Sequence, residues 1–393
     1  MARKDLSGLK HYKYSAVDKS PLSYYILTPY WQFCTNLLPL WVAPNLITLT
    51  GLGFIVANVF SILVLLPDLK GPGPAWLYYS FAAGLFIYQT ADNMDGKQAR
   101  RTGSSSALGE LFDHGIDSLN CTLGGIVLCS AMGFGATRDG AVIMIISSWP
   151  MFFSSWEQFH TGTLYLGYFN GPTEGILIAC GCMLVSAIWG PGIWQQPLAA
   201  LFPILQGLVK SQTLLKDAFM LMTYSALFFV HIPFCIYNVY LARSARGLDT
   251  ASTLLQWLPL GLFTGAAAAW IGSPYGTILR DNHMILFGVL CCLVFGRMTT
   301  KIILAHLLRQ PFPLFTVQLV PLLLGAAIVN APMLGVQLIS AEQEVKLLWL
   351  CLGVSTVMYV SWAEHVIRDF TTYLGISCLT IPYADSRKRD LLA

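Results

Sequence analysis

The sequence predicts an all-α fold, a polytopic integral membrane protein of about ten transmembrane helices, and three observations lead to that prediction. Of its 393 residues, 55% are hydrophobic and only 11% are charged, whereas about a quarter of the residues of soluble domains are charged. Apolar runs close to the ~20 residues that a helix needs to cross a bilayer recur along most of the chain. Lysine and arginine gather in short clusters beside these runs, where orienting charges are expected.

The first apolar run is preceded by an aromatic-rich stretch. Residues 22–42 contain several tyrosines and tryptophans, which favours a helix lying at the membrane interface, with an amphipathic helix packed on the bundle as the alternative. The run that follows, LITLTGLGFIVANVFSILVLL, contains no charged residue. We predict transmembrane helices over residues 46–66, 75–93, 109–132, 141–158, 173–189, 218–241, 254–272, 283–304, 312–330 and 345–365.

The basic residues predict the orientation of the chain in the membrane. If the N-terminus lies in the cytoplasm, most of the 23 lysines and arginines fall on the cytoplasmic side, as the positive-inside rule requires. An even number of spans then returns the C-terminus to the cytoplasm, and the connection over residues 93–108 faces the cytoplasm as well. The first residues have no apolar core, so a cleaved signal peptide is not expected.

Charge and cysteine usage argue against two classes of function. The net charge of +3 is too small, and the basic residues are too scattered, to predict a nucleic acid partner. The ten cysteines lie mostly inside apolar runs, without the spacing of a zinc site or a thioredoxin-like motif. We expect them to be small buried hydrophobic residues.

One stretch concentrates carboxylates at the ends of two consecutive spans. It reads DNMDGKQARRTGSSSALGELFDHGIDSLN and contains Asp92, Asp95, Asp113 and Asp117. Spacings of three and four residues place each pair on one helix face, so two facing helices present four carboxylates. Unpaired carboxylates at membrane depth are costly, and a divalent cation would neutralise them. An all-oxygen ligand set with no nearby cysteine favours Mg²⁺ or Mn²⁺ over zinc.

Small residues flank this acidic cluster. Gly96, Ala99 and Gly109 occur where the second span ends and the third begins, which leaves room for a phosphate or a nucleotide to approach the backbone. Arg100 comes directly after Ala99 in the sequence, and its guanidinium group is expected to bind a phosphate group. The neighbouring Arg101 carries no assigned role.

The residues from Asp92 to Asp117 spell Asp-x-x-Asp-Gly-x-x-Ala-Arg, eight further residues, and Gly-x-x-x-Asp-x-x-x-Asp. This pattern resembles the signature of the CDP-alcohol phosphotransferase family and departs from it at no fixed position. Flanking stretches look like the eukaryotic choline and ethanolamine phosphotransferase branch, and especially its fungal cholinephosphotransferase-like members. These stretches begin at Ala43, Asp95, Gly109, Trp156 and Gly171, and the likeness covers nearly the whole chain.

The resemblance implies an enzyme that transfers phosphocholine or phosphoethanolamine from CDP-choline or CDP-ethanolamine to diacylglycerol. The products would be the phosphatidyl lipid and CMP, and the cofactor would be Mg²⁺, with Mn²⁺ as a substitute, held by the four aspartates. His114 is the expected base, since histidine titrates near neutral pH, and Asp117 is the alternative. The residues expected at the CDP-alcohol are Asn45, Gly96, Ala99, Arg100, Gly109 and Glu110; for Asn45, capping of the first span is the alternative.

The resemblance also implies a division of the chain into segments. Residues 1–45 would form a cytoplasmic and interfacial segment, 46–189 the catalytic helices, 190–217 a non-cytoplasmic connection, 218–365 the lipid chamber and dimer contacts, and 366–393 a cytoplasmic tail. Within the connection, LAALFPILQGL is expected to form a half-buried helix. A homodimer in the endoplasmic reticulum, or alternatively the Golgi, with its site facing the cytoplasm, is implied.

Three alternatives remain open from the sequence. The enzyme could prefer ethanolamine or use both alcohols. Trp156, Glu157, His160 and Glu174 could cage a quaternary ammonium, although interface anchoring explains Trp156 equally well. From a different class, a membrane transporter could use the aspartates as an ion path.

Overall fold

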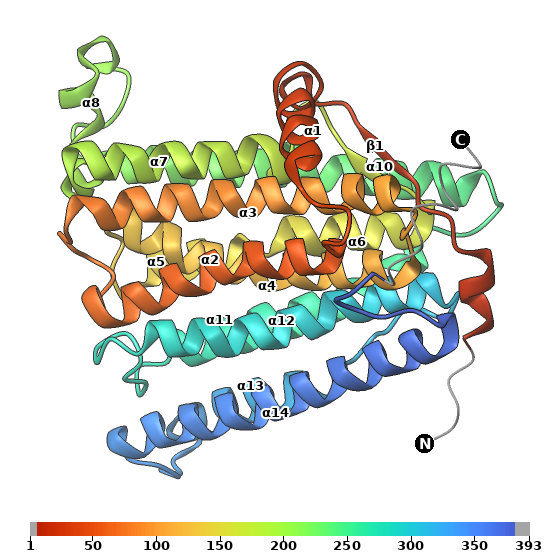
Figure 1. Ribbon diagram of the computed structural model, residues 1–393. Coiled ribbons are helices and arrows are strands. Elements are labelled where there is room, and N and C mark those ends of the chain that lie inside the picture. The colour runs from red at the N-terminus through yellow and green to blue at the C-terminus, as the bar shows by residue number, and fades with distance from the viewer. Residues whose placement is uncertain (1–5, 382–393) are drawn as a thin grey trace.

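The computed structural model describes residues 6–381, and their regular structure is almost entirely helical. Long helices lie side by side in one bundle, with the N-terminal segment and the end of the last helix at the same end of it (Figure 1). The segment before the bundle comprises η1 (Ser7–His11), β1 (Ala16–Asp18), η2 (Ser23–Leu27) and α1 (Thr28–Leu37). Helices therefore occupy the aromatic-rich stretch, whose position at a membrane interface remains a prediction.

Three helices at the centre of the first half carry the acidic motif. They are α2 (Pro44–Leu65), α3 (Ala75–Thr102) and α4 (Ala107–Ala131). Glycine lets α2 and α3 approach closely, because a Cβ atom on Gly51 would stand 2.9 Å from the Cβ of Ala91. The side chain of Asn58 in α2 occupies the space that a side chain at Gly84 of α3 would need, and its Nδ2 donates to the carbonyl of Ser80 (3.1 Å). This packing fixes the height at which α2 faces the aspartates of α3.

The rest of the bundle follows in chain order. α12 is the most enclosed of the membrane-span candidates and packs along α4, where Thr299 donates to Ser118 (2.7 Å). The remaining elements are α5 (Arg138–Ile146), α6 (Trp149–Thr161), β2 (Leu164–Leu166), η3 (Gly171–Gly175), α7 (Ile176–Trp189), η4 (Pro191–Gln195), α8 (Leu198–Leu201), η5 (Pro203–Leu205), α9 (Leu215–Ser225), η6 (Ala226–His231), α10 (Ile232–Ser244), η7 (Ala251–Trp257), α11 (Leu258–Ile271), α12 (Met284–Leu307), α13 (Leu319–Asn330), η8 (Ala331–Leu334) and α14 (Ala341–Leu374).

Every predicted transmembrane segment is largely helical, but its extent often differs from the prediction. Six helical stretches are long and apolar enough to cross a membrane: Pro44–Leu65, Gly171–Trp189, Leu215–Ser244, Ala251–Ile271, Met284–Leu307 and Ala341–Leu374. The two helices with the aspartates are long but more polar, α5 and α6 divide one predicted span, and α13 is short. Ten crossings therefore remain a prediction, whereas a mostly helical protein with several helices long and apolar enough to span a membrane is confirmed.

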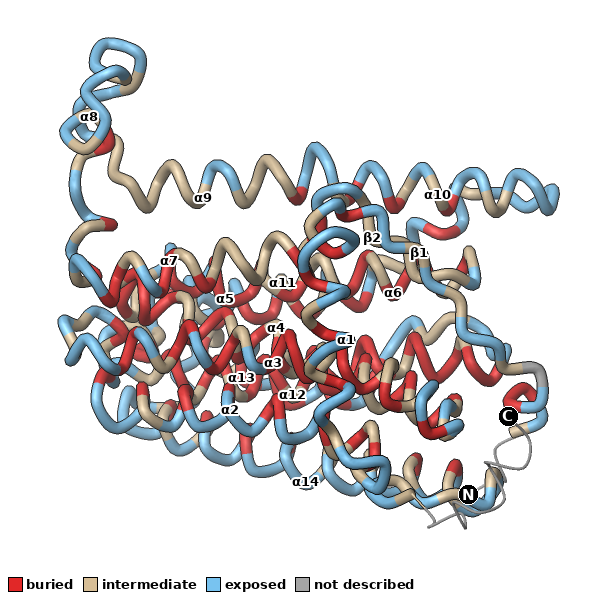
Figure 2. Tube along the Cα trace, turned by 45° about the horizontal axis from the view of Figure 1, so that its top comes forward, coloured by how far each residue is buried: buried red, intermediate tan, exposed pale blue. Residues whose placement is uncertain are grey.

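Large apolar side chains on the outside of the bundle support this conclusion. Phe60, Phe229, Leu350 and Val357 are exposed, although each lies on a long helix where a soluble protein would place polar residues. Figure 2 shows the buried residues gathered inside the bundle, while much of α10 and α14 is exposed at its margins and α9 is mostly intermediate. A bilayer would cover this surface.

The connection over residues 190–217 differs from the sequence prediction. Only the four residues of α8 are α-helical within the LAALFPILQGL stretch, and Phe202, Ile204 and Leu208 are exposed. Figure 1 shows this segment projecting from the end of the bundle opposite the N-terminal segment. The prediction of a half-buried helix is wrong, because Pro203 and the turn at Gly207, with its positive φ of 86°, end the helix early.

The N-terminal segment is fastened across one end of the bundle. Strand β1 pairs in parallel with β2, with Val17 opposite Tyr165, and Ser15 shares a hydrogen bond with Thr163 (2.9 Å). Gly8 lies so close to the backbone of Leu308 that a Cβ atom would stand 2.8 Å from its carbonyl carbon. The segment thus covers the end of the bundle where α4 begins. The helix α14 also continues to Leu374, beyond the predicted start of the tail at residue 366.

The contact between α11 and α13 offers a test of the fold. A Cβ atom on Gly325 would overlap the ring of Trp270, which is fully buried and donates from Nε1 to Glu344 (2.9 Å). Gly325→Ala should therefore destabilise the protein by about 1–3 kcal/mol, as overpacking does. Thermal unfolding in detergent measures the change.

Gly265→Ala in α11 is the matched control, because an added methyl group there meets no atom within 4 Å. It should leave stability unchanged or raise it by about 0.5–1 kcal/mol, since alanine favours the helix. Equal unfolding temperatures for the two variants would contradict the packing described.

Candidate active site

The acidic helices are joined by a short turn whose ends are well defined. α3 ends at Gly103, which adopts a left-handed conformation (φ 64°) that glycine takes without strain. α4 then begins after Ser106, whose side chain accepts a hydrogen bond from the backbone N–H of Gly109 (3.1 Å). The turn lets the C-terminal part of α3 and the N-terminal part of α4 face each other, as the motif spacing predicts.

The four aspartates converge between these two helices. Asp113 of α4 lies close to both Asp92 and Asp95 of α3. Asp117, one turn further along α4, is close enough to act electrostatically on all three. Ligand atoms of Asp113, His114 and Asp117 lie within 4.8 Å of one another. The convergence of the four carboxylates is therefore present in the structure.

Two neighbouring side chains donate hydrogen bonds to the carboxylates. Thr48 of α2 donates its hydroxyl hydrogen to Asp95, and Tyr88 of α3 donates to Asp117. Each donor is buried and lies about one helical turn from another site residue, Thr48 after Asn45 and Tyr88 before Asp92. Sequence reasoning selected neither residue for this role, because an isolated threonine or tyrosine in an apolar helix is common.

The donor set fits a divalent cation. Among the described residues, one oxygen of Asp92 and one of Asp113, Oδ1 in each case, are buried without a hydrogen-bond partner. Buried carboxylate oxygens without partners are unfavourable, and hard cations prefer such oxygens as ligands. No lysine or arginine forms an ion pair with these four aspartates in residues 6–381. Asp92, Asp95, Asp113 and Asp117 are the residues that would hold the cation.

His114 belongs to a buried chain of side chains beside the aspartates. Its Nε2 lies 3.1 Å from Oε1 of Gln158 in α6, and Nε2 of Gln158 donates to Oε1 of Glu110 (2.8 Å). Its Nδ1 is 3.6 Å from Oδ2 of Asp113. The three side chains of Glu110, Gln158 and His114 are all buried. Sequence reasoning missed Gln158, which lies 44 residues from His114 along the chain.

The small residues named from the sequence do leave open space. A Cβ atom on Gly96 would meet only the guanidinium of Arg100, at 3.5 Å, and one on Gly109 would approach only Ser106 and Asn45. Ala99 is half-buried and Arg100 is exposed at the end of α3. These residues border the acidic cluster on the side of α2, where a nucleotide would have access to backbone.

Asn45 lies near Gly109 but does not cap a helix. The N-cap of α2 is Ala43, without a side-chain hydrogen bond, and Pro44 occupies the first turn. Asn45 instead donates from Nδ2 to the carbonyl oxygen of Cys378 (2.9 Å). The capping alternative for Asn45 is therefore wrong, and its side chain links α2 to the segment after α14.

Other residues considered from the sequence have structural contacts. Arg101 donates to the backbone carbonyls of Thr35 (3.0 Å) and Leu38 (2.7 Å), so it fastens α1 to α3. Glu174 accepts from Ser20 and from the backbone N–H of Asn170 (2.8 Å), which places it in the turn before α7.

Residues suggested to cage a quaternary ammonium have partners within the protein. Trp156 and His160 both donate or share hydrogen bonds with Gln256 (2.8 and 2.7 Å), and Trp156 packs edge-on against Trp257. Glu157 is buried and accepts from Asn238 (2.6 Å). Trp156, Glu157 and His160 are therefore engaged by side chains of other helices, and a role of these residues in binding a quaternary ammonium stays a prediction.

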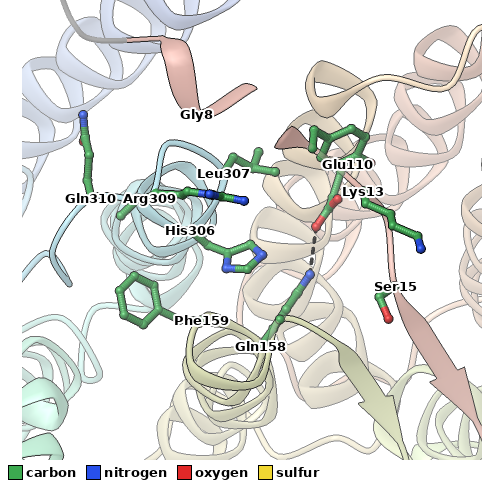
Figure 3. A pocket seen from close by; sticks show the side chains of 13 residues that line it. Gly8, Lys13, Ser15, Glu110, Gln158, Phe159, His306, Leu307, Arg309 and Gln310 are labelled. Carbon is green, nitrogen blue, oxygen red and sulfur yellow. Dashed lines mark hydrogen bonds between the residues drawn. The ribbon is translucent and has the colours of Figure 1, made fainter. Parts of the chain in front are cut away.

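A cavity of about 380 Å³ opens on the other side of Glu110. Figure 3 shows Glu110, Gln158, His306 and Arg309 directed toward it, with Lys13 of the N-terminal segment at its edge. Tyr12 also lines it, and burial together with the negative charge of Glu110 raises the pKa of the Tyr12 phenol above its ordinary value. The Tyr12 hydroxyl is therefore a close neighbour of the Glu110 carboxylate.

Comparison with known proteins agrees with this site. Residues 41–189 match the family model described as CDP-alcohol phosphatidyltransferase. The chain is 36% identical to choline/ethanolaminephosphotransferase 1 of Arabidopsis thaliana, covering 96% of this chain and 97% of the relative. It is 34% identical to cholinephosphotransferase 1 of Saccharomyces cerevisiae (96% and 97%) and 30% identical to human ethanolaminephosphotransferase 1 (94% and 92%).

The acidic cluster predicts a stabilising effect of magnesium that does not depend on activity. Because four converging carboxylates repel one another, Mg²⁺ should raise the unfolding temperature, and a concentration of 100 times Kd would add about 2.7 kcal/mol of stability. Asp113→Asn should lose most of this response and should be more stable than the unchanged protein in EDTA. Thermal unfolding across a magnesium titration measures both effects.

Asp139→Asn is the control, since Asp139 pairs with Lys216 (3.6 Å) away from the cluster. It should respond to Mg²⁺ like the unchanged protein. An unchanged unfolding temperature in Mg²⁺ for the natural sequence would contradict a cation site.

Proposed function

We propose, from the premise that this chain belongs to the CDP-alcohol phosphatidyltransferase family, that it transfers phosphocholine or phosphoethanolamine from a CDP-alcohol to diacylglycerol and releases CMP. The observation that carries the proposal is the convergence of Asp92, Asp95, Asp113 and Asp117 beside open glycine surfaces. The chain is similarly related to relatives named for choline transfer and to relatives named for ethanolamine transfer. These comparisons therefore favour neither a choline-specific nor an ethanolamine-specific enzyme, and use of both alcohols is compatible with them.

The proposed chemistry is attack of the lipid hydroxyl on the phosphorus that bears the alcohol. A divalent cation held by the four aspartates, Mg²⁺ or Mn²⁺, would neutralise charge on the CMP leaving group. His114 is the proposed base, because it is buried beside Asp113 and has a ring nitrogen free of hydrogen bonds to the described residues. Asp117 is the less suitable base, since it already accepts a hydrogen bond from Tyr88.

The remaining residues are assigned to substrate binding. Gly96, Ala99 and Gly109 would admit the pyrophosphate and nucleotide to the backbone, and Arg100 would pair with phosphate oxygens. Asn45 and Glu110 would contact the CDP-alcohol from the two sides of the cluster. We assign residues 46–189 to the catalytic helices and 218–365 to the chamber for the lipid acceptor.

The membrane setting of the reaction is also part of the proposal. The acidic ends of α3 and α4 would face the cytoplasm, where the nucleotide is dissolved, and the lipid acceptor would enter from the bilayer. We place the enzyme as a homodimer in the endoplasmic reticulum, with the Golgi as the alternative. Arg100, Arg101, Arg243 and Arg309, all at one end of the bundle, fit a cytoplasmic surface under the positive-inside rule.

Purified protein tests the reaction directly. With Mg²⁺, diacylglycerol and either CDP-choline or CDP-ethanolamine, it should release CMP and form the corresponding lipid. Asp117→Asn should lower the turnover by at least about 100-fold, since it removes charge from the cation site. Measuring the two CDP-alcohols in competition gives the head-group preference.

Asp249→Asn supplies a control far from the cluster, because Asp249 caps a surface turn through Ser252 and Ala251. Its CMP release should match that of the natural sequence. Transport of an ion or solute by reconstituted protein that releases no CMP would instead establish the transporter alternative.

A second prediction concerns the base. His114→Asn should lower kcat by about 10²–10⁴-fold, the range that a general base contributes, while magnesium still raises the unfolding temperature. Full activity in this variant would transfer the role to Asp117 or to solvent.

A further inference from the structure

We propose that Gln158 is a positioning residue that fixes the tautomer of His114, so that Nε2 carries the hydrogen and Nδ1 is the nitrogen that accepts a proton. The kinetic part of this inference rests on the proposed function, whereas the tautomer itself does not. Gln158 lies outside the acidic motif, on α6, and its side chain is only 2% exposed.

The orientation of the Gln158 amide is set by Glu110. Nε2 of Gln158 donates to Oε1 of Glu110 at 2.8 Å, and both groups are buried (Figure 3). A reversed amide would bring its carbonyl oxygen against a carboxylate oxygen, and neither atom has a hydrogen to donate. A carboxylate accepts only, so the amide nitrogen must face Glu110 and the amide oxygen must face away from it.

The orientation of the amide then determines the hydrogen on His114. Oε1 of Gln158 lies 3.1 Å from Nε2 of His114, and an amide oxygen can only accept. Nε2 must therefore carry hydrogen in both the neutral and the protonated ring. In the neutral ring the single lone pair is left on Nδ1.

The surroundings of Nδ1 suit a base. Nδ1 is buried and has no hydrogen-bond partner among residues 6–381, and it faces the acidic cluster, 3.6 Å from Oδ2 of Asp113. That separation is too long for a hydrogen bond. An acceptor hydroxyl placed at the cluster would meet Nδ1 rather than Nε2, which points away toward α6.

The same contacts show what loss of Gln158 would change. Without the amide, Nε2 would have no acceptor, and the negative charge of Asp113 would favour hydrogen on Nδ1 instead. The lone pair would then point toward α6, away from the substrate. Glu110 would also lose its buried donor. Supporting residues of this kind typically contribute about 10–100-fold to activity.

Nitrogen-15 NMR of histidine-labelled protein with Mg²⁺ tests the tautomer. The His114 signals, assigned by their loss in His114→Asn, should show a protonated Nε2 and an unprotonated Nδ1 in the neutral ring. In Gln158→Leu, hydrogen should appear on Nδ1. A neutral His114 with hydrogen on Nδ1 in the natural sequence, or identical signals in Gln158→Leu, would overturn the inference without any measurement of activity.

Kinetics then separate positioning from packing. Gln158→Leu should lower kcat about 10–100-fold and change KM for the CDP-alcohol by less than about threefold. Gln158→Glu still accepts from Nε2 and can share a proton with Glu110, so its kcat should lie above that of the leucine variant. Equal kcat values for the two variants would overturn the positioning role.

Gln256→Leu is the matched control. It removes two hydrogen bonds from α6, those with Trp156 (2.8 Å) and His160 (2.7 Å), without touching His114. Its kcat should stay within about twofold of the natural value and its His114 signals should not move. A loss of kcat as large as that of Gln158→Leu would assign the effect to α6 packing. Absence of CMP release by the natural sequence would refute the proposed function and leave the NMR result standing.

Discussion

Electrostatic repulsion among four converging carboxylates is the constraint on which the rest of the structure depends. Asp92, Asp95, Asp113 and Asp117 face one another between two helices in a largely apolar bundle, where like charges are poorly screened. The described residues offset little of this charge, since the side chains that donate to it, the hydroxyls of Thr48 and Tyr88 and the amide of Asn93, are all neutral. The helices that carry the aspartates must therefore be held together by packing elsewhere, or by a cation.

That packing comes from close helix contacts on either side of the cluster. Glycines at positions 51 and 84 bring α2 and α3 into contact, which places Thr48 at the height of Asp95. On the opposite side, α4 lies against the buried helix α12, with Thr299 donating to Ser118. The cluster thus lies between two close helix contacts, which hold the acidic helices α3 and α4 in place on either side.

Sequence reasoning found the aspartates because they lie close together in the sequence at spacings that place them on one helix face. It found the helices because their apolar runs are long. It missed Thr48, Tyr88 and Gln158, which meet the site only through tertiary contacts. It also offered a helix cap as the alternative role of Asn45 from residue type alone, although Ala43 holds that position. For Trp156 and its neighbours, proximity along the chain likewise did not reveal the contacts with Gln256 and Trp257.

Both ends of the described chain contact residues of the candidate site. In the proposed topology these contacts lie on the cytoplasmic side. Near the N-terminal end, Tyr12 approaches Glu110. Near the C-terminal end, the backbone carbonyl of Cys378 accepts a hydrogen bond from Nδ2 of Asn45 (2.9 Å). Because that donor is already engaged, the group that Asn45 offers toward Gly109 is its acceptor, Oδ1. An acceptor at this place suits a hydroxyl or amino hydrogen of a nucleoside rather than a phosphate oxygen. Under the proposed function, phosphate recognition would therefore fall to Arg100, to the backbone near the glycines and to a cation held by the aspartates.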